Sequence, residues 1–97
     1  MNLPATVRVG SLTYQVICDG VADANHNYGE TNPIEQKIRL GALVTPERLA
    51  ETLLHEIIHA VNLDRSTQLK ESQVRNLANG LCALLQDMGY WPREVEK

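Results

Sequence analysis

The sequence predicts an α+β fold in which a small antiparallel or mixed β-sheet packs on two antiparallel helices. Short runs in which apolar and polar residues alternate occupy about residues 5–40. Two longer runs follow over about residues 46–63 and 70–88, and their apolar positions have helical spacing. Strands that precede the helices, rather than alternating with them, are typical of this fold class. We expect residues 1–97 to form a single domain with one modest core.

The first predicted element is a β-hairpin. Residues 6–9 alternate between polar and apolar side chains and end at Gly10 and Ser11, which are typical turn residues. Residues 12–18 place an apolar side chain at every second position, which favours a second strand. Residues 21–28 carry Asp and Asn without clear periodicity, so we expect a loop or a short helical turn there.

A further strand is predicted over residues 36–40, because Ile38 and Leu40 alternate with charged neighbours. Residues 30–32 can pair with this strand through a turn that begins at Pro33. The amino-terminal part of the chain is therefore expected to supply the whole sheet.

The first long helix has a clear start. Thr45 suits the N-cap, Pro46 suits the first helical position, and Glu47 places negative charge near the positive end of the helix dipole. We expect this helix to run from Pro46 to about Leu63.

The second long helix is expected over about residues 70–88, with Gly89 as its C-terminal cap. We expect Tyr90 and Trp91 to fold back onto the body of the domain and residues 94–97 to fray. The apolar positions of this helix recur at helical spacing. They are Val74, Leu77, Ala78, Leu81, Leu84, Leu85 and Met88.

Composition narrows the classes of partner and location. The hydrophobic and charged fractions, 43% and 22%, are typical of globular proteins in solution. A net charge of −3 without a basic run argues against nucleic acid as the main partner. Cys18 and Cys82 are too few for a disulfide framework and lack metal-type spacing, so we expect reduced thiols. With no membrane-length apolar run and no leader pattern, we expect a cytoplasmic protein without membrane partners.

The strongest functional signal is a His-Glu-x-x-His motif within residues 53–60. Residues four apart on a helix lie about 40° apart around its axis, so the imidazoles of His55 and His59 can reach one metal ion. Glu56 lies about 100° around from His55, where it can take a proton from metal-bound water. The alternative is that both histidines only bond to backbone carbonyls. A metal is the better prediction, because burying both rings and a carboxylate without one would be costly.

A catalytic zinc has three protein ligands and keeps one position for water, so a third ligand is needed. Glu71 is the first candidate, because it continues the expected buried stripe of the second helix, which runs through positions 74, 78 and 81. Its other role would be to stabilise the helix N-terminus electrostatically. Asp64, five residues after His59, is the alternative ligand, and His26 is the third option.

Two supporting roles stay open. Asn62 shares a helix face with His59, so it can hydrogen-bond a ligand or cap the end of the helix. Tyr28, Tyr90 and His26 are candidates for polarising the carbonyl oxygen of a substrate, although a packing or surface role is favoured for each of them.

The run from Leu53 to Ala60, followed by the run from Glu71 to Leu81, resembles small zincin-like proteins of phages and prophages. These are similar to minimal IrrE/ImmA-type metallopeptidases, and the resemblance covers roughly residues 28–88. It implies a sheet against the active-site helix, zinc bound by two histidines and a glutamate at Glu71, and a glutamate base. The sequence departs from this pattern at Arg75, where gluzincins often carry an acid one turn after the third ligand.

These observations predict a hydrolase: a zinc-dependent metallopeptidase in which Glu56 is the general base for attack on a peptide or protein substrate. An extended substrate could pair with an edge strand at residues 36–40. The alternative is a non-catalytic, metal-stabilised binding or adaptor module. A deformylase-like hydrolase ranks last, because residues 16–20 do not match the motif that supplies the cysteine ligand in that family. Iron, cobalt, nickel and manganese also suit two histidines and a carboxylate.

Overall fold

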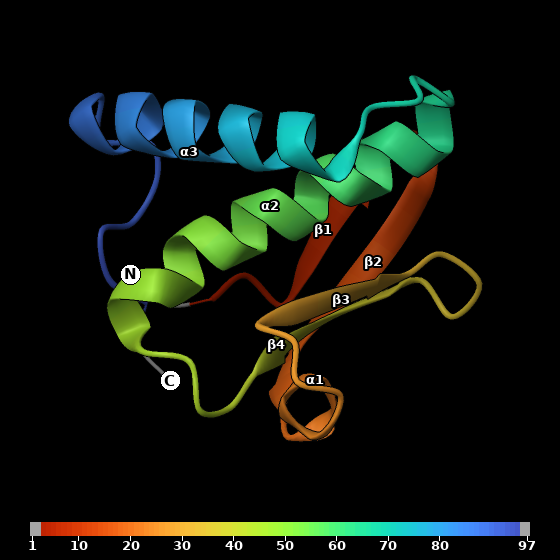
Figure 1. Cartoon of the computed structure of the whole chain (residues 1–97), viewed down its shortest axis with the longest axis horizontal. Coiled ribbons are helices and arrows are strands. Elements are labelled where there is room, and N and C mark those ends of the chain that lie inside the picture. The colour runs from red at the N-terminus through yellow and green to blue at the C-terminus, as the bar shows by residue number, and fades with distance from the viewer. Residues whose placement is uncertain (1–2, 96–97) are drawn as a thin grey trace.

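The computed structural model describes residues 3–95 and confirms the α+β fold (Figure 1). β1 (Thr6–Val9) and β2 (Leu12–Asp19) form the predicted antiparallel hairpin. β4 (Lys37–Gly41) pairs with β2 in parallel, and β3 (Gly29–Asn32) pairs with β4 in antiparallel fashion. The strand order is therefore β1-β2-β4-β3. This order corrects one expectation: β4 lies inside the sheet, and β3 lies at its edge next to β4.

The connection from β2 to β4 contains α1 (Val21–Ala24), the short helical turn expected among residues 21–28. A parallel neighbour cannot be reached by a tight turn, so the chain uses α1 and β3 to return to the start of β4. As predicted, β3 then joins β4 through the turn that begins at Pro33.

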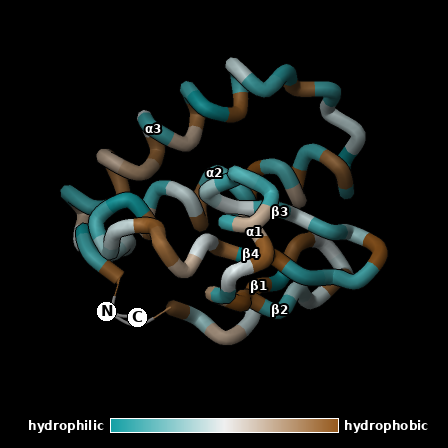
Figure 2. The backbone as a smooth tube through the Cα atoms, turned by 60° about the horizontal axis from the view of Figure 1, so that its bottom comes forward, coloured by the Kyte–Doolittle hydropathy of each residue, from teal (hydrophilic) through white to brown (hydrophobic). Residues whose placement is uncertain are grey.

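α2 (Pro46–Arg65) lies across one face of the sheet. The backbone N–H of Arg48 donates to the hydroxyl of Thr45, at 3.4 Å, so Thr45 is the N-cap as predicted. The helix continues past its expected end until Ser66 takes a left-handed conformation with φ of 53°. The apolar face of α2 packs on the sheet, and the core lies between them. Its fully buried residues include Tyr14, Ile38, Leu40, Leu49, Ala50, Leu53 and Ala60. In the hydropathy colouring of Figure 2, hydrophobic segments of the strands lie close together near β1 and β4.

α3 (Glu71–Asp87) runs antiparallel to α2 and packs on its outer side, farther from the sheet (Figure 1). The buried residues of α3 are Val74, Ala78 and Cys82. The buried stripe therefore continues to Cys82, and the prediction that it continues to Leu81 was wrong. Positions 74, 78 and 82 follow one helix face at spacings of four. A second apolar stripe lies beside it and is between 41% and 55% exposed: Leu77, Leu81, Leu84 and Met88.

The chain after α3 returns to the start of α2. The indole N–H of Trp91 donates to the carbonyl of Ala50 at 2.8 Å, as the predicted return requires, whereas Tyr90 stays 69% exposed. The expectation that residues 94–97 fray is wrong for Val95. Its side chain is buried and its N–H donates to the carbonyl of Pro46 at 3.1 Å, so apolar burial and a backbone hydrogen bond hold it in place. Residues 96 and 97 lie outside the described residues.

Candidate metal centre

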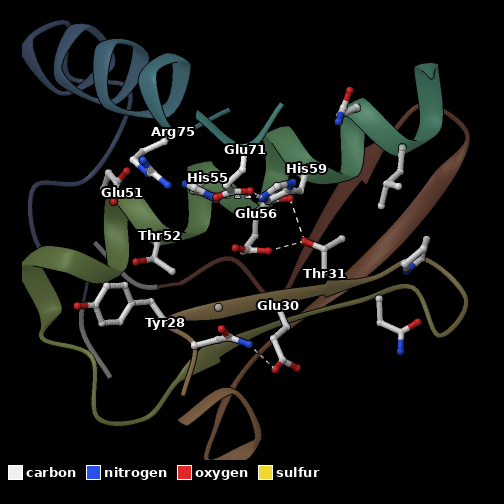
Figure 3. A pocket seen from close by; sticks show the side chains of 16 residues that line it. Tyr28, Glu30, Thr31, Glu51, Thr52, His55, Glu56, His59, Glu71 and Arg75 are labelled. Carbon is white, nitrogen blue, oxygen red and sulfur yellow. Dashed lines mark hydrogen bonds and ion pairs between the residues drawn. The ribbon is translucent and has the colours of Figure 1, made fainter. Parts of the chain in front are cut away.

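α2 presents both histidines of the motif on its side facing β3 and α3 (Figure 3). The opposite side of the helix buries Leu53 and Ala60 against the sheet, so the helix cannot turn to hide the imidazoles. The side chains of His55 and His59 are 16% and 28% exposed. Their Nε2 atoms are 3.1 Å apart, as spacing by one helical turn allows.

Glu71, the first residue of α3, completes a cluster of three. Its Oε1 lies 2.8 Å from His55 Nε2, and its Oε2 lies 2.8 Å from His59 Nε2. Among the described residues, these side chains form the group that could hold a metal ion, with ligand atoms within 4.8 Å of one another. The structure thus brings together the three residues that the sequence singled out as ligands.

The donor set and its spacing suit zinc. Imidazole nitrogen and carboxylate oxygen bind Zn²⁺ at about 2.0–2.2 Å, and ligands at that distance around a tetrahedral ion are about 3.3 Å apart. The two Nε2 atoms are 3.1 Å apart, close to that value, and each lies 2.8 Å from a different oxygen of Glu71. With one ligand atom from each residue, the three atoms lie within 4.8 Å of one another, so they are close enough to share one ion. Three protein ligands leave one tetrahedral position for water or substrate.

The two alternative third ligands lie elsewhere. Asp64 lies against the turn of the β1–β2 hairpin: a Cβ added at Gly10 would be 2.4 Å from its Oδ2. It also forms an ion pair with Arg65, at 3.4 Å. His26 follows α1 with φ of 60°, and its N–H donates to the carbonyl of Asp23. Neither side chain belongs to the cluster around His55.

The short connection between α2 and α3 explains how Glu71 reaches the histidines. Ser66 and Gln68 both adopt left-handed conformations, which turn the chain sharply. The side chain of Asn62 holds this turn: its Oδ1 accepts from the N–H of Leu69 at 2.9 Å and from the hydroxyl of Thr67. Its amide also donates to the carbonyl of Leu69 at 3.3 Å. Asn62 thus binds the connection, rather than hydrogen-bonding a histidine.

We expect Asn62→Ala to weaken zinc binding by about 10-fold, the low end of the range for residues that hydrogen-bond a ligand directly, because Asn62 acts on Glu71 only through the turn. Competition with a chromophoric chelator would measure this change. Asn79→Ala, an exposed asparagine of α3 outside the cleft, is the matched control. Equal zinc affinities for the Asn62 variant and the wild type would contradict this role.

Glu56 is buried between α2 and β3, with only 7% of the residue exposed. The hydroxyl of Thr31 donates to its Oε1 at 2.8 Å (Figure 3). Burial raises the pKa of Glu56 above its ordinary value, and the nearby Glu71 adds to this rise. The hydrogen bond from Thr31 and the neighbouring imidazoles oppose it. A carboxylate of raised pKa beside a candidate metal position suits a general base.

The raised pKa has a consequence for stability. Glu56 keeps its proton to higher pH in the folded state than in the unfolded state. The free energy of unfolding therefore falls as the pH rises above about 4.5, the ordinary pKa of the carboxyl group. Glu56→Gln cannot ionise. In chelator-treated protein we therefore expect this variant to melt at a higher temperature than the wild type near pH 7, and the difference to shrink towards pH 4. A difference that does not change with pH would contradict this expectation.

No protein-family model, curated protein or solved structure matches this chain. The resemblance to IrrE/ImmA-type metallopeptidases stays a prediction from the motif. The geometry of the site must therefore carry any functional proposal.

The three candidate ligands lie on an open cleft of about 860 Å³ between β3, α2 and the start of α3. Sequence reasoning gave no role to several of its residues, including two threonines. Thr31 comes from β3 and contacts Glu56, and Thr52 lies one turn before Glu56 on α2. Arg75, noted only as a departure from a family pattern, brings a guanidinium to the cleft wall one turn after Glu71. Alternation along the strand predicts which face of the sheet Thr31 lies on, but it does not predict that Thr31 contacts Glu56.

Of the candidates for polarising a carbonyl, only Tyr28 lines the cleft. The guanidinium of Arg48 lies over its ring, 4.8 Å from the centroid, which fixes the ring at the rim. Tyr90 follows the far end of α3, and His26 lies near α1, so neither lines this cleft. Among the described residues, no helix has the length and apolar character needed to cross a membrane.

Proposed function

We propose that this protein is a zinc-dependent metallopeptidase that acts on peptides or unfolded protein segments in the cytoplasm. The observation that carries the proposal is the convergence of His55, His59 and Glu71 from two helices, with the buried carboxylate of Glu56 beside them. A site that served stability alone would need the ligands but not this carboxylate, since burying an ionisable group is costly.

A bound zinc ion and the side chains of the cleft would each supply part of the chemistry. A zinc ion bound by the three ligands would supply a water of lowered pKa and polarise the peptide carbonyl. Glu56 is the residue that would hold and move the proton, as a general base towards water in the cleft and then as a general acid towards the leaving amine. Arg75 and Tyr28 line the same cleft, where a cation and a phenol can bind the carbonyl side of an extended peptide.

β3 is the strand on which such a peptide could lie, in place of the expected residues 36–40. It is an edge strand and lines the cleft. The carbonyl of Tyr28 accepts from the N–H of Gly41, so by alternation residues 28, 30 and 32 turn their backbone groups towards β4. Gly29 and Thr31 then turn theirs towards the open edge, where an added strand would pair.

The second candidate is a non-catalytic, metal-stabilised binding module. The exposed apolar stripe of α3 favours it, because such a surface is typical of a contact with another protein. In this reading zinc would only join α2 to α3.

Zinc analysis combined with peptide hydrolysis separates the two candidates. Protein purified without added metal should contain about one zinc per chain by elemental mass spectrometry. A random-sequence peptide library incubated with this protein should give products by mass spectrometry, and chelation followed by zinc addition should abolish and restore them. Zinc without any hydrolysis, together with unfolding on chelation, would favour the binding module. Protein without zinc would overturn both candidates.

A further inference from the structure

The side chain of Glu56, which belongs to α2, also accepts a hydrogen bond from the sheet, through Thr31 of β3. We propose that Thr31 is the positioning residue of the general base: its hydroxyl fixes one carboxylate oxygen of Glu56 and leaves the other for proton transfer. This inference rests on the proposed peptidase function. It concerns a residue of β3, outside the His-Glu-x-x-His helix.

The register of the sheet fixes the direction of the Thr31 side chain. Thr31 lies opposite Ile38 in the β3–β4 pair, and directly opposed residues project to the same face of a sheet. Ile38 is fully buried in the core beneath α2. Thr31 therefore also projects towards α2, and its hydroxyl reaches both Oε1 of Glu56, at 2.8 Å, and the backbone carbonyl of Glu56, at 3.1 Å.

The single hydroxyl proton of Thr31 faces two acceptors of Glu56, the backbone carbonyl and Oε1, so it can serve both only as a three-centre hydrogen bond. The contact to Oε1, at 2.8 Å, is the shorter one, and the carbonyl at 3.1 Å keeps the hydroxyl close to the helix backbone. The side chain of Glu56 must then bring Oε1 to that hydroxyl, which restricts rotation of the carboxylate group. Oε2 remains as the oxygen that accepts a proton from the cleft.

Gly29 allows this approach. A Cβ at Gly29 would lie 2.9 Å from Cγ of Glu56 and 3.0 Å from Cγ2 of Thr52, both closer than side chains normally come. Gly29 and Thr31 are two apart on β3, so they share the face that meets α2. The missing side chain at Gly29 lets the strand lie close enough to α2 for the hydroxyl of Thr31 to reach the base.

The position of Thr31 also links the base to the substrate. Its side chain holds Glu56, while its backbone groups turn towards the open edge on which an extended peptide would pair. One residue would then fix the distance between the proton acceptor and the scissile bond. Errors of about 1 Å in such a distance can cost about 100-fold in rate.

The test compares Thr31→Val with Thr31→Ser. Valine keeps the shape and the strand preference of threonine but has no hydroxyl, whereas serine keeps the hydroxyl. With the best-cleaved member of the random peptide library as substrate, we expect Thr31→Val to lower kcat roughly 10- to 100-fold with little change in KM. Thr31→Ser should recover most of the loss. Thr13→Val, the same change at an exposed position of β2, is the matched control and should leave kcat unchanged.

Zinc content, measured on the same preparations, should be alike in the wild type and the Thr31 variants. Thr31→Val should melt at a somewhat lower temperature than the wild type, because the buried carboxylate of Glu56 loses a hydrogen bond, and Thr31→Ser should recover most of this difference. Wild-type kcat in Thr31→Val, or a loss that serine does not recover, would overturn the positioning role while the peptidase proposal stands. Loss of zinc from Thr31→Val would also overturn it, since the hydroxyl would then support the metal ligands. A wild-type protein with zinc but no turnover would overturn the peptidase proposal, and this role of Thr31 with it.

Discussion

Glu56→Gln is expected to bind zinc as the wild type does and to hydrolyse peptides roughly 100- to 10,000-fold more slowly. Glutamine has almost the same shape as glutamate and still offers an oxygen to the hydroxyl of Thr31, which contacts Oε1 in the wild type. It cannot accept a proton from water at neutral pH. The change should therefore appear in kcat, with zinc content unaltered, and both can be measured on one preparation.

Glu47→Gln is the matched control for this prediction. It makes the same chemical change on the same helix, in the first turn and outside the cleft. Its kcat should equal that of the wild type. Turnover by Glu56→Gln at the rate of this control would show that the carboxylate of Glu56 takes no part in the reaction.

Glu71→Ala is expected to lower zinc affinity by more than about 100-fold, because loss of a supporting residue alone typically costs 10- to 100-fold. The variant removes the carboxylate that spans both imidazoles, with oxygens 2.8 Å from each Nε2. Protein purified without added metal should then contain little zinc, as elemental mass spectrometry can measure. Hydrolysis should fall with the zinc and return only at high zinc concentration.

Asp64→Ala is the control for the third ligand, because it removes a carboxylate that is closer to His59 in sequence than Glu71 is but lies against the β1–β2 turn. It should keep its zinc. Zinc lost from Asp64→Ala and kept by Glu71→Ala would reverse the assignment.

Local sequence signals predicted most of the elements. The caps at Thr45 and Pro46 set the start of α2, and alternation set the strands, because these features depend on neighbours in the chain. The stripe of α3 was partly wrong for a physical reason. The apolar side chains of α3 cover a wider part of its surface than α2 contacts. Periodicity alone does not tell which of them meet α2, so the sequence predicts burial of Leu81 where the structure buries Cys82.

Helix geometry predicted only those residues of the site that lie on the two long helices. The spacing of His55 and His59 lies within one helix, and Glu71 followed from the direction of an antiparallel neighbour. Thr31 was missed because its contact with Glu56 joins residues 25 apart through the sheet. Val95 was missed because its burial depends on where the last residues meet α2, and no periodic pattern marks that place.

The centre is assembled from contacts of different sequence separation. His55 and Glu71 are 16 residues apart in one helical hairpin, so closing the ligand set requires a short loop and little chain entropy. The proposed base contacts a residue of β3, which belongs to the sheet through its pairing with β4. Under the proposed function, zinc binding and hydrolysis would therefore depend on different parts of the fold and could be inherited separately. A lineage that altered β3 would then lose turnover and keep the ion, so a zinc-holding descendant without activity would be a short mutational step away.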